Sequence, residues 1–376
     1  MYKLGVIGLG HWFERLYEGI KKTDMIAIDK AASVSGIEKK GAQLTRLGIM
    51  HDRYYKLVPG APIPDEFFKG LDIVHISNPN QFHAEQTLQS LSSNKITITE
   101  KTFGVNKKEF SRVLNYITRN ELQGKAYLHL HYVHKQLVLR LPGLLQEFTE
   151  TEGKVVSTAA TFFEMANEEG IRRSSWLFKP ESGGLFMDWI HPFEIYLKGA
   201  LASSMTLHGF KKYAVNTSYD SDNPTGIEAE VLLQGRFFSK DAKAVMRVSE
   251  GVDQAHKTKV ARFFFESGNH LDLNFIDSGL EFTSSNRGSW ELRKGKDNSV
   301  IRSGRPGGPT SSDILVSDMV GLCEGSNPGL TIDEMKALFE PQWDYQRTAK
   351  DAGLITDLDE VAEFMRNGSR VCTAAN

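Results

Sequence analysis

The spacing of apolar residues divides the chain into two regions. Over roughly the first 125 residues, short β-branched runs alternate with stretches whose apolar residues recur at helical spacing. This alternation predicts right-handed βαβ units and a parallel sheet that is covered on both faces. The predicted strands are 4–7, 31–37, 71–77, 96–99 and 126–131, and the predicted helices are 13–22, 38–47, 81–91 and 106–120.

After about residue 150, strand-like runs follow one another, and several alternate apolar and polar residues as a sheet with one solvated face does. They are 155–163, 206–213, 228–238, 244–248, 260–265, 271–275 and 280–282, with helices near 185–199, 312–324 and 331–350. We therefore predict an α/β domain, 1–128, and an α+β domain, 129–376, that contains a large, mainly antiparallel open sheet.

The composition excludes several classes of protein. The 376 residues exceed the size at which one hydrophobic core stops growing, which supports two domains. The chain has a net charge of −2, without the excess of basic residues that is typical of nucleic-acid-binding proteins. No apolar run approaches the length of a membrane span. The two cysteines, and an amino terminus that runs into a strand without a signal-peptide core, predict a cytoplasmic protein.

A glycine-rich turn follows the first predicted strand and opens the first predicted helix. Gly8 and Gly10 allow a tight turn and close approach of the backbone to a pyrophosphate, whose charge the helix amino terminus favours. His11 and Trp12 follow, and Phe13 stands at the third fingerprint position in place of glycine or alanine. The position of this turn favours an NAD(P)-binding Rossmann domain over an ordinary glycine-rich turn.

The end of the second predicted strand indicates which dinucleotide binds. NAD sites usually have an acidic residue there, which binds the ribose hydroxyls. Here the strand ends with Ser35 and Gly36, and Glu38 and Lys39 open the next helix. A small hydroxyl residue with two nearby lysines, Lys39 and Lys40, suits a 2′-phosphate. We therefore predict NADP, with NAD as second choice; the alternative is a solvated helix start in which Lys39 and Lys40 have no role.

Four segments in this order resemble the glucose–fructose oxidoreductase/inositol dehydrogenase (Gfo/Idh/MocA) family. They are the turn at Gly8 and Gly10, residues 77–83 (Ser-Asn-Pro-Asn-Gln-Phe-His), Glu100-Lys101, and Gly183-Gly184 followed by Asp188 and His191. The resemblance implies a Rossmann domain, a second domain with a large open sheet, and oxidation or reduction of a sugar or polyol carbon with NAD(P). It also implies a homodimer or homotetramer that forms through the carboxyl-terminal sheet.

The resemblance also implies roles for single residues. Asn78 and Pro79 would line the nicotinamide pocket, Glu100 would lie near the nicotinamide ribose, and Lys101 matches the catalytic lysine. The residues expected to bind cofactor are Gly8, Gly10, His11, Trp12, Ser35, Gly36, Lys39, Ser77, Asn78, Pro79, His83, Glu100, Lys101 and Trp176. Those expected to bind substrate are Lys101, Tyr132, Lys135, Asp188 and His191.

The sequence departs from the family pattern at two places. Thr102 stands where the family usually has proline, so we expect a differently shaped turn after Lys101. Asp188 and His191 are three residues apart rather than four, and Pro192 follows. Because proline disfavours helical geometry at the residue before it, we expect a helix that is broken or restarted at His191.

The predicted chemistry is hydride transfer between nicotinamide and the carbinol carbon of a sugar, sugar phosphate or polyol. His191 would be the general base for alcohol oxidation. Lys101 would hydrogen-bond the reacting oxygen and share the proton transfer, and Asp188 would hold the imidazole or a substrate hydroxyl. The structural alternatives are a solvated strand end for Lys101, a helix-start charge for Asp188 and a satisfied structural histidine for His191.

Two other functions fit the same residues. The fold also serves as a non-catalytic sensor of dinucleotide or sugar, and the same scaffold could reduce a non-sugar carbonyl. A metal site is not expected, because His129, His131 and His134 have no cysteine or carboxylate neighbour that completes a ligand set.

Overall fold

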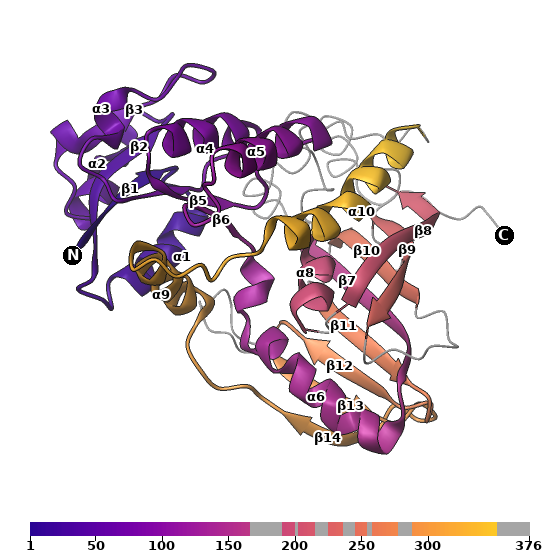
Figure 1. Ribbon diagram of the computed structural model, residues 1–376. Helices are drawn as coiled ribbons and strands as arrows, with labels where there is room; N and C mark the ends of the chain where they lie inside the picture. The colour runs from indigo at the N-terminus through magenta and orange to yellow at the C-terminus, as the bar shows by residue number, and fades with distance from the viewer. Residues whose placement is uncertain are drawn as a thin grey trace, which may run out of the picture. The chain divides into compact units, whose positions relative to one another are not determined.

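The computed structural model describes residues 1–165, 190–199, 202–214, 225–235, 245–253, 258–276 and 288–351 (Figure 1). The chain forms two compact units, Met1–His131 with Pro309–Asp333, and Tyr132–Gly308 with Glu334–Asn376. Helix α9 (Ser311–Cys323) belongs to the first unit, although the sequence analysis grouped it with the second domain. Its apolar residues, among them Leu315 and Met319, complete the core beneath α1 (His11–Ile20), and periodicity alone does not reveal that partner.

The first unit is built on a six-stranded sheet with the order β3-β2-β1-β4-β5-β6, in which all neighbouring strands are parallel. This is the strand order of dinucleotide-binding sheets, and it reverses between β1 and β4. The predicted Rossmann architecture is confirmed. The strands are β1 (Tyr2–Ile7), β2 (Ile26–Ser33), β3 (Tyr54–Lys56), β4 (Ile73–Ile76), β5 (Ile96–Glu100) and β6 (Ala126–His129).

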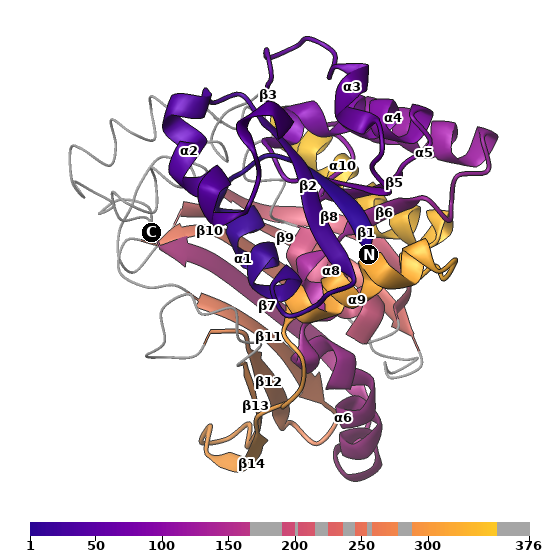
Figure 2. The ribbon, with the colours of Figure 1, turned by 90° about the vertical axis from the view of Figure 1, so that its left-hand side faces the viewer.

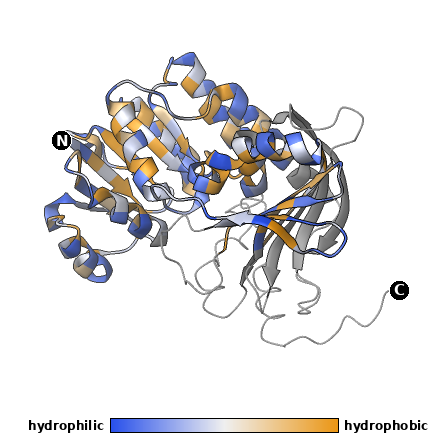
Figure 3. Cartoon of the chain, turned by 90° about the horizontal axis from the view of Figure 1, so that it is seen from below, coloured by the Kyte–Doolittle hydropathy of each residue, from blue (hydrophilic) through white to orange (hydrophobic). Residues whose placement is uncertain are grey.

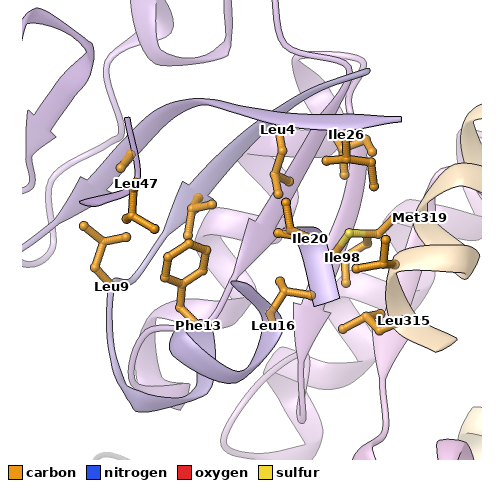
Figure 4. Close-up of a cluster of buried hydrophobic side chains, with 14 of the residues drawn as sticks. Leu4, Leu9, Phe13, Leu16, Ile20, Ile26, Leu47, Ile98, Leu315 and Met319 are labelled. Carbon is orange, nitrogen blue, oxygen red and sulfur yellow. The ribbon is translucent and has the colours of Figure 1, made fainter. Parts of the chain in front are cut away.

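Helices cover both faces of this sheet. They are α1, α2 (Ile37–Arg46), α3 (Asp65–Phe68), α4 (His83–Ser92), α5 (Lys107–Arg119) and α9, with short 3-10 turns at His51–Arg53 and Asn80–Phe82. A further 3-10 turn, His131–His134, begins at the residue where the first unit ends. Figure 3 shows both hydrophobic and hydrophilic residues on the coloured helices, as expected for amphipathic helices. One face packs on α1 and α9 through a continuous core that includes Leu4, Phe13 and Ile98 (Figure 4).

The second unit contains an eight-stranded sheet with the order β14-β13-β12-β11-β7-β10-β9-β8. Strands β7 and β10 pair in parallel and the other neighbours are antiparallel, so the predicted large, mainly antiparallel sheet is confirmed. Figure 2 shows β11 to β14 in succession along one half of it. The strands are β7 (Val155–Met165), β8 (Ala202–Ala214), β9 (Thr225–Gly235), β10 (Val245–Asp253), β11 (Thr258–Phe265), β12 (His270–Asn274), β13 (Ser289–Arg293) and β14 (Val300–Gly304).

Three helices complete the description: α6 (Gln136–Glu152), α8 (Ile190–Gly199) and α10 (Ile332–Asp351). Within the second unit, α6 packs against α8. The predicted strand at 280–282 lies outside the described residues. Among the helices that the structure describes, none has the length and apolar character needed to cross a membrane.

Candidate active site

The glycine turn between β1 and α1 leaves no room for a side chain at its first glycine. Gly8 has a φ of +100°, and a Cβ there would lie 2.6 Å from the main-chain nitrogen of Asn78. The hydroxyl of Ser77 donates to the Gly8 carbonyl at 2.9 Å, which ties the turn to the loop after β4. Only glycine combines this backbone conformation with so close an approach.

The helix that follows is open at its amino terminus. Gly10 is the exposed N-cap of α1, and none of the described side chains caps the helix there. A Cβ at Gly10 would meet no described atom within 4 Å. Because the first N–H groups of a helix lack intrahelical partners, this end can bind an anion. The turn therefore fits the pyrophosphate of a dinucleotide.

The residues after Gly10 pack the helix onto the sheet. Phe13 stands at the third fingerprint position and is fully buried. Its ring occupies space in the core between the helix and the sheet, where a glycine or alanine would allow closer packing. The Trp12 ring lies edge-on to His131 at 5.0 Å between centroids, and the Arg15 guanidinium lies 4.6 Å from the Trp12 centroid. His11 begins α1, but its side chain is outside the description.

Hydroxyl groups occupy the end of β2. The Ser33 and Tyr54 hydroxyls share a hydrogen bond of 2.7 Å, and the Tyr54 hydroxyl also donates to the Ser35 carbonyl. Burial raises the pKa of Tyr54 above its ordinary value. The strand itself thus ends without a carboxylate, in agreement with the reading of Ser35 as part of a site for a phosphorylated ribose.

The two lysines at the start of α2 have different surroundings. Lys40 donates from Nζ to the Leu9 carbonyl at 2.8 Å, so it anchors the glycine turn, and burial lowers its pKa. Lys39 is exposed in the first turn of the helix. The Glu38 carboxylate lies over Gly36, with Oε1 2.0 Å from the place that a Cβ on Gly36 would occupy. Lys39 and Glu38 therefore offer opposite charges at one helix start.

His83 supports the loops that follow β4 and β5. Its Nδ1 lies 2.9 Å from the Thr102 carbonyl oxygen, its Nε2 lies 2.7 Å from the Asn78 carbonyl oxygen, and the ring is fully buried. Burial lowers the pKa of His83, so the ring is neutral and a single N–H donates at a time. The cofactor contact predicted for His83 stays a prediction; in the structure the ring contacts both loops and holds them together.

The loop after β4 retains one buried acceptor. The Oδ1 atom of Asn78 is buried and has no hydrogen-bond partner among the residues that the structure describes. A buried polar atom of this kind carries a free-energy cost that a bound donor removes. Pro79 is exposed beside it. Asn78 is therefore suited to hold a donor such as the carboxamide of nicotinamide.

Lys101 follows β5 directly and is 7% exposed. This burial argues against the alternative of a solvated strand end. Its peptide bond to Thr102 is cis. Since ligands of parallel sheets bind beyond the carboxyl ends of the strands, Lys101 stands where a catalytic group is expected.

Glu100 precedes Lys101 and forms a cluster with two histidines. Its Oε1 lies 2.7 Å from His129 Nδ1 and 3.3 Å from His75 Nε2. Burial by itself raises the pKa of the Glu100 carboxyl, but the two histidines outweigh that effect and hold the pKa well below its usual range. The carboxyl group is therefore ionised at neutral pH.

The second unit holds His191 in a second carboxylate cluster. His191 is buried in the first turn of α8, and its Nδ1 lies 2.8 Å from Oε1 of the fully buried Glu194. The other oxygen, Oε2, accepts the main-chain N–H of Tyr132 at 2.6 Å. The Tyr132 and His191 ring centroids lie 4.7 Å apart, and the Lys135 ammonium lies 5.1 Å from the Tyr132 centroid. The structure therefore brings together Tyr132, Lys135 and His191.

Pro192 does not interrupt α8. The helix begins at Ile190, so Pro192 lies in its first turn, where the missing N–H would have no intrahelical partner anyway. The helix is continuous from Ile190 to Gly199, and the residues before Ile190, where the expected break would show, lie outside the description. Asp188 and Trp176, which were predicted to bind substrate and cofactor, lie outside the described residues.

Glu194, His75 and His129 belong to these clusters but were not predicted as parts of the site. Glu194 follows His191 by three residues, a spacing that places both on one helix face, so its signal was present. His75 and His129 lie on strands either side of Glu100, and only the strand order brings them together. In the described structure, the Glu194 carboxylate holds the imidazole of His191. This role had been predicted for Asp188.

Comparisons with known proteins give the fold. No protein-family model and no curated protein sequence matches the chain. Among solved structures, an aldose-aldose oxidoreductase from Caulobacter crescentus matches with a TM-score of 0.66 at 12% identity, over 98% of this chain and 99% of that one. The chain has the two-domain fold of the Gfo/Idh/MocA oxidoreductases.

Two further structures share this fold. A 3-ketoreductase from Actinomadura kijaniata in complex with NADP matches with a TM-score of 0.64 at 15% identity, over 98% of each chain. A UDP-N-acetylglucosamine 3-dehydrogenase from Acidithiobacillus ferrooxidans matches with a TM-score of 0.61 at 14% identity, over 95% of this chain and 98% of that one. The expected fold is thus confirmed over nearly the whole chain, whereas identities this low leave the reaction to be argued from the residues.

Proposed function

We propose that the chain is an NADP-dependent oxidoreductase that transfers a hydride between nicotinamide and the carbinol carbon of a sugar, sugar phosphate or polyol. The observation that carries this proposal is Lys101, buried at the carboxyl end of β5 in a sheet whose glycine turn fits a pyrophosphate. Structures of the same fold include sugar oxidoreductases and a ketoreductase with NADP bound, which supports the choice of substrate class and cofactor.

The residues of the first unit have distinct roles in this proposal. Gly8, Gly10 and the amino terminus of α1 would bind the pyrophosphate, and Asn78 would hold the carboxamide. When bound, the nicotinamide supplies the hydride chemistry. Lys101 would hydrogen-bond the reacting oxygen and stabilise the negative charge that develops there.

The residues of the second unit would handle the proton. Glu194 accepts from Nδ1 of His191, which fixes the tautomer in which Nε2 carries the lone pair. With that tautomer His191 can act as a general base in alcohol oxidation and as an acid in the reverse reaction. Tyr132 and Lys135, beside His191, would contact the substrate.

The test is a spectrophotometric screen of the purified protein. With NADP present, at least one member of a panel of aldoses, inositols, sugar acids and sugar phosphates is expected to produce absorbance of the reduced nicotinamide. The screen is repeated in reverse with NADPH and keto sugars, and with simple non-sugar ketones as the comparison. Turnover of the non-sugar carbonyls alone would show that the substrate is not a sugar. Dinucleotide binding without any turnover would favour the non-catalytic sensor. Assembly as a homodimer or homotetramer through the second unit's sheet stays a prediction.

The charges at the start of α2 are expected to set the cofactor preference. Lys39→Ala should raise the KM for NADP by about tenfold and leave that for NAD nearly unchanged, because a charge-assisted hydrogen bond contributes about 1.5–3 kcal/mol. Glu38→Gln should lower the KM for NADP, since it removes a carboxylate that repels the 2′-phosphate. Lys107→Ala, at the exposed start of α5, is the matched control. A wild-type preference for NAD in the same kinetics would overturn the choice of NADP.

A further inference from the structure

A buried His–Glu–His cluster crosses three neighbouring strands of the first unit. Strand order places β5 between β4 and β6, and the register pairs Glu100 with His129. Residues at alternate positions share a face of the sheet, so Glu100 lies on the face of Ile98, and His75 on that of Ile73, both of which belong to the α1 and α9 core. The cluster therefore lies at the carboxyl end of that covered face, beside Lys101.

Both histidines converge on one oxygen of the carboxylate. His129 Nδ1 and His75 Nε2 approach Oε1 at 2.7 and 3.3 Å, and these side chains are 6% and 1% exposed. The other ring nitrogen of His75, Nδ1, is buried and has no partner among the described residues, so Nε2 is the nitrogen that carries the proton and donates. Two donors on one oxygen fix the carboxylate in a single orientation.

The second carboxylate oxygen remains available. The described structure contains no hydrogen bond to Oε2 of Glu100, yet Oε2 is not among the buried atoms that lack a partner. The Glu100 side chain is 13% exposed. Solvent therefore reaches Oε2 at the carboxyl edge of the sheet, where a ligand would also meet it.

The cluster differs from a metal site. Its two imidazole nitrogens point at a carboxylate oxygen at hydrogen-bond distances rather than at a common vacant point. Among the residues that the structure describes, no group of three His, Cys, Asp or Glu side chains is arranged to hold a metal ion. The arrangement instead orients one carboxylate.

We propose that His75 and His129 are positioning residues, which hold Glu100 so that Oε2 accepts hydroxyl groups of the ribose in the second half of the dinucleotide. Sheets of this order consist of two mononucleotide-binding halves, and β4 to β6 form the second. In such folds a carboxylate at a strand end is the usual acceptor for ribose hydroxyls in the first half, and Glu100 places the same chemical group at a strand end in the second half. The inference rests on the proposed dinucleotide-binding function and assigns two residues to it that no motif contains.

The test compares a complete dinucleotide with its adenine half. Calorimetry measures the Kd of NADP and of adenosine 2′,5′-bisphosphate, which lacks the second ribose, for the wild-type protein and for His129→Leu and His75→Leu. Each substitution should raise the Kd of NADP by about tenfold, which is the scale of one charge-assisted hydrogen bond. The Kd of the bisphosphate should stay unchanged. Gln at either position can still donate to Oε1, so His129→Gln and His75→Gln should recover most of the affinity.

Controls separate positioning from simple destabilisation. His51→Gln, at an exposed histidine of the same unit, should change neither Kd. Thermal unfolding of every variant shows whether the first unit is folded, and a folded variant that loses both ligands equally would overturn the positioning role. Equal NADP affinity in His129→Leu and wild type would also overturn it. A wild-type protein that binds neither ligand would refute the proposed function itself, a result distinct from selective loss.

Discussion

Replacement of Lys101 with methionine is expected to lower kcat by about a thousandfold while the Kd of NADP changes little. Methionine keeps most of the side-chain volume but removes the ammonium group that would hydrogen-bond the reacting oxygen. Loss of one preorganised donor to a developing oxyanion lowers turnover by about 10²–10³-fold, and a lost proton-transfer group by about 10²–10⁴-fold. Because Lys101 is 7% exposed, it has the restricted surroundings in which such a donor is most effective.

Steady-state kinetics and calorimetry on the same preparation measure this prediction. Lys107→Met, at an exposed lysine a few residues later, controls for the loss of one positive charge. Lys101→Arg adds a second comparison, since guanidinium keeps the charge but not the compact ammonium geometry, and it should recover only part of the rate. Turnover of Lys101→Met at the wild-type level would mean that Lys101 is a structural residue. The chemistry would then have to come from another group.

The sequence predicted the architecture because both sheets follow simple periodicities. Strand–helix alternation is visible where short buried strands are rich in β-branched residues, as at Ile73–Ile76 and Ile96–Glu100. The prediction of β2 was displaced, since it was expected at 31–37 and lies at Ile26–Ser33. Lys30, charged but 4% exposed, interrupts the apolar pattern there. Its ammonium donates to the Glu66 and Lys69 carbonyls. These partners are more than 30 residues away in the sequence, so the local pattern cannot predict that Lys30 is buried.

Other elements were invisible for similar physical reasons. Strand β3 has three residues, too few for a periodicity, and β14 is mostly exposed and has little apolar signal. Helix α6 contains Pro142, which the sequence-based rules treat as a helix breaker. At the candidate site, motifs supplied Gly8, Asn78 and Lys101. The groups that orient the site came only from the folded chain, because strand order and helix phase bring their partners together.

Replacement of Glu194 with glutamine is expected to lower kcat by about 10²–10⁴-fold, the range of a lost general base. The Glu194 carboxylate accepts two N–H groups, from His191 Nδ1 and from the Tyr132 main chain. Glutamine has a single carbonyl oxygen, so it can accept one of them and must present its NH₂ group to the other. If the oxygen stays with Tyr132, the NH₂ group donates to Nδ1, and the proton of the neutral imidazole moves to Nε2, which can then no longer act as a base.

The dependence of kcat on pH distinguishes this tautomer effect from a loss of folding. A folded Glu194→Gln enzyme should keep its KM values within a few-fold but lose the ionisation of the base from its pH profile, whereas Glu150→Gln, on the exposed face of α6, should behave as wild type. Since an unsatisfied buried group costs about 1–3 kcal/mol, some loss of thermal stability is expected as well. An unchanged kcat and pH profile would show that Glu194 serves only to connect α8 with Tyr132, and His191 would no longer qualify as the base.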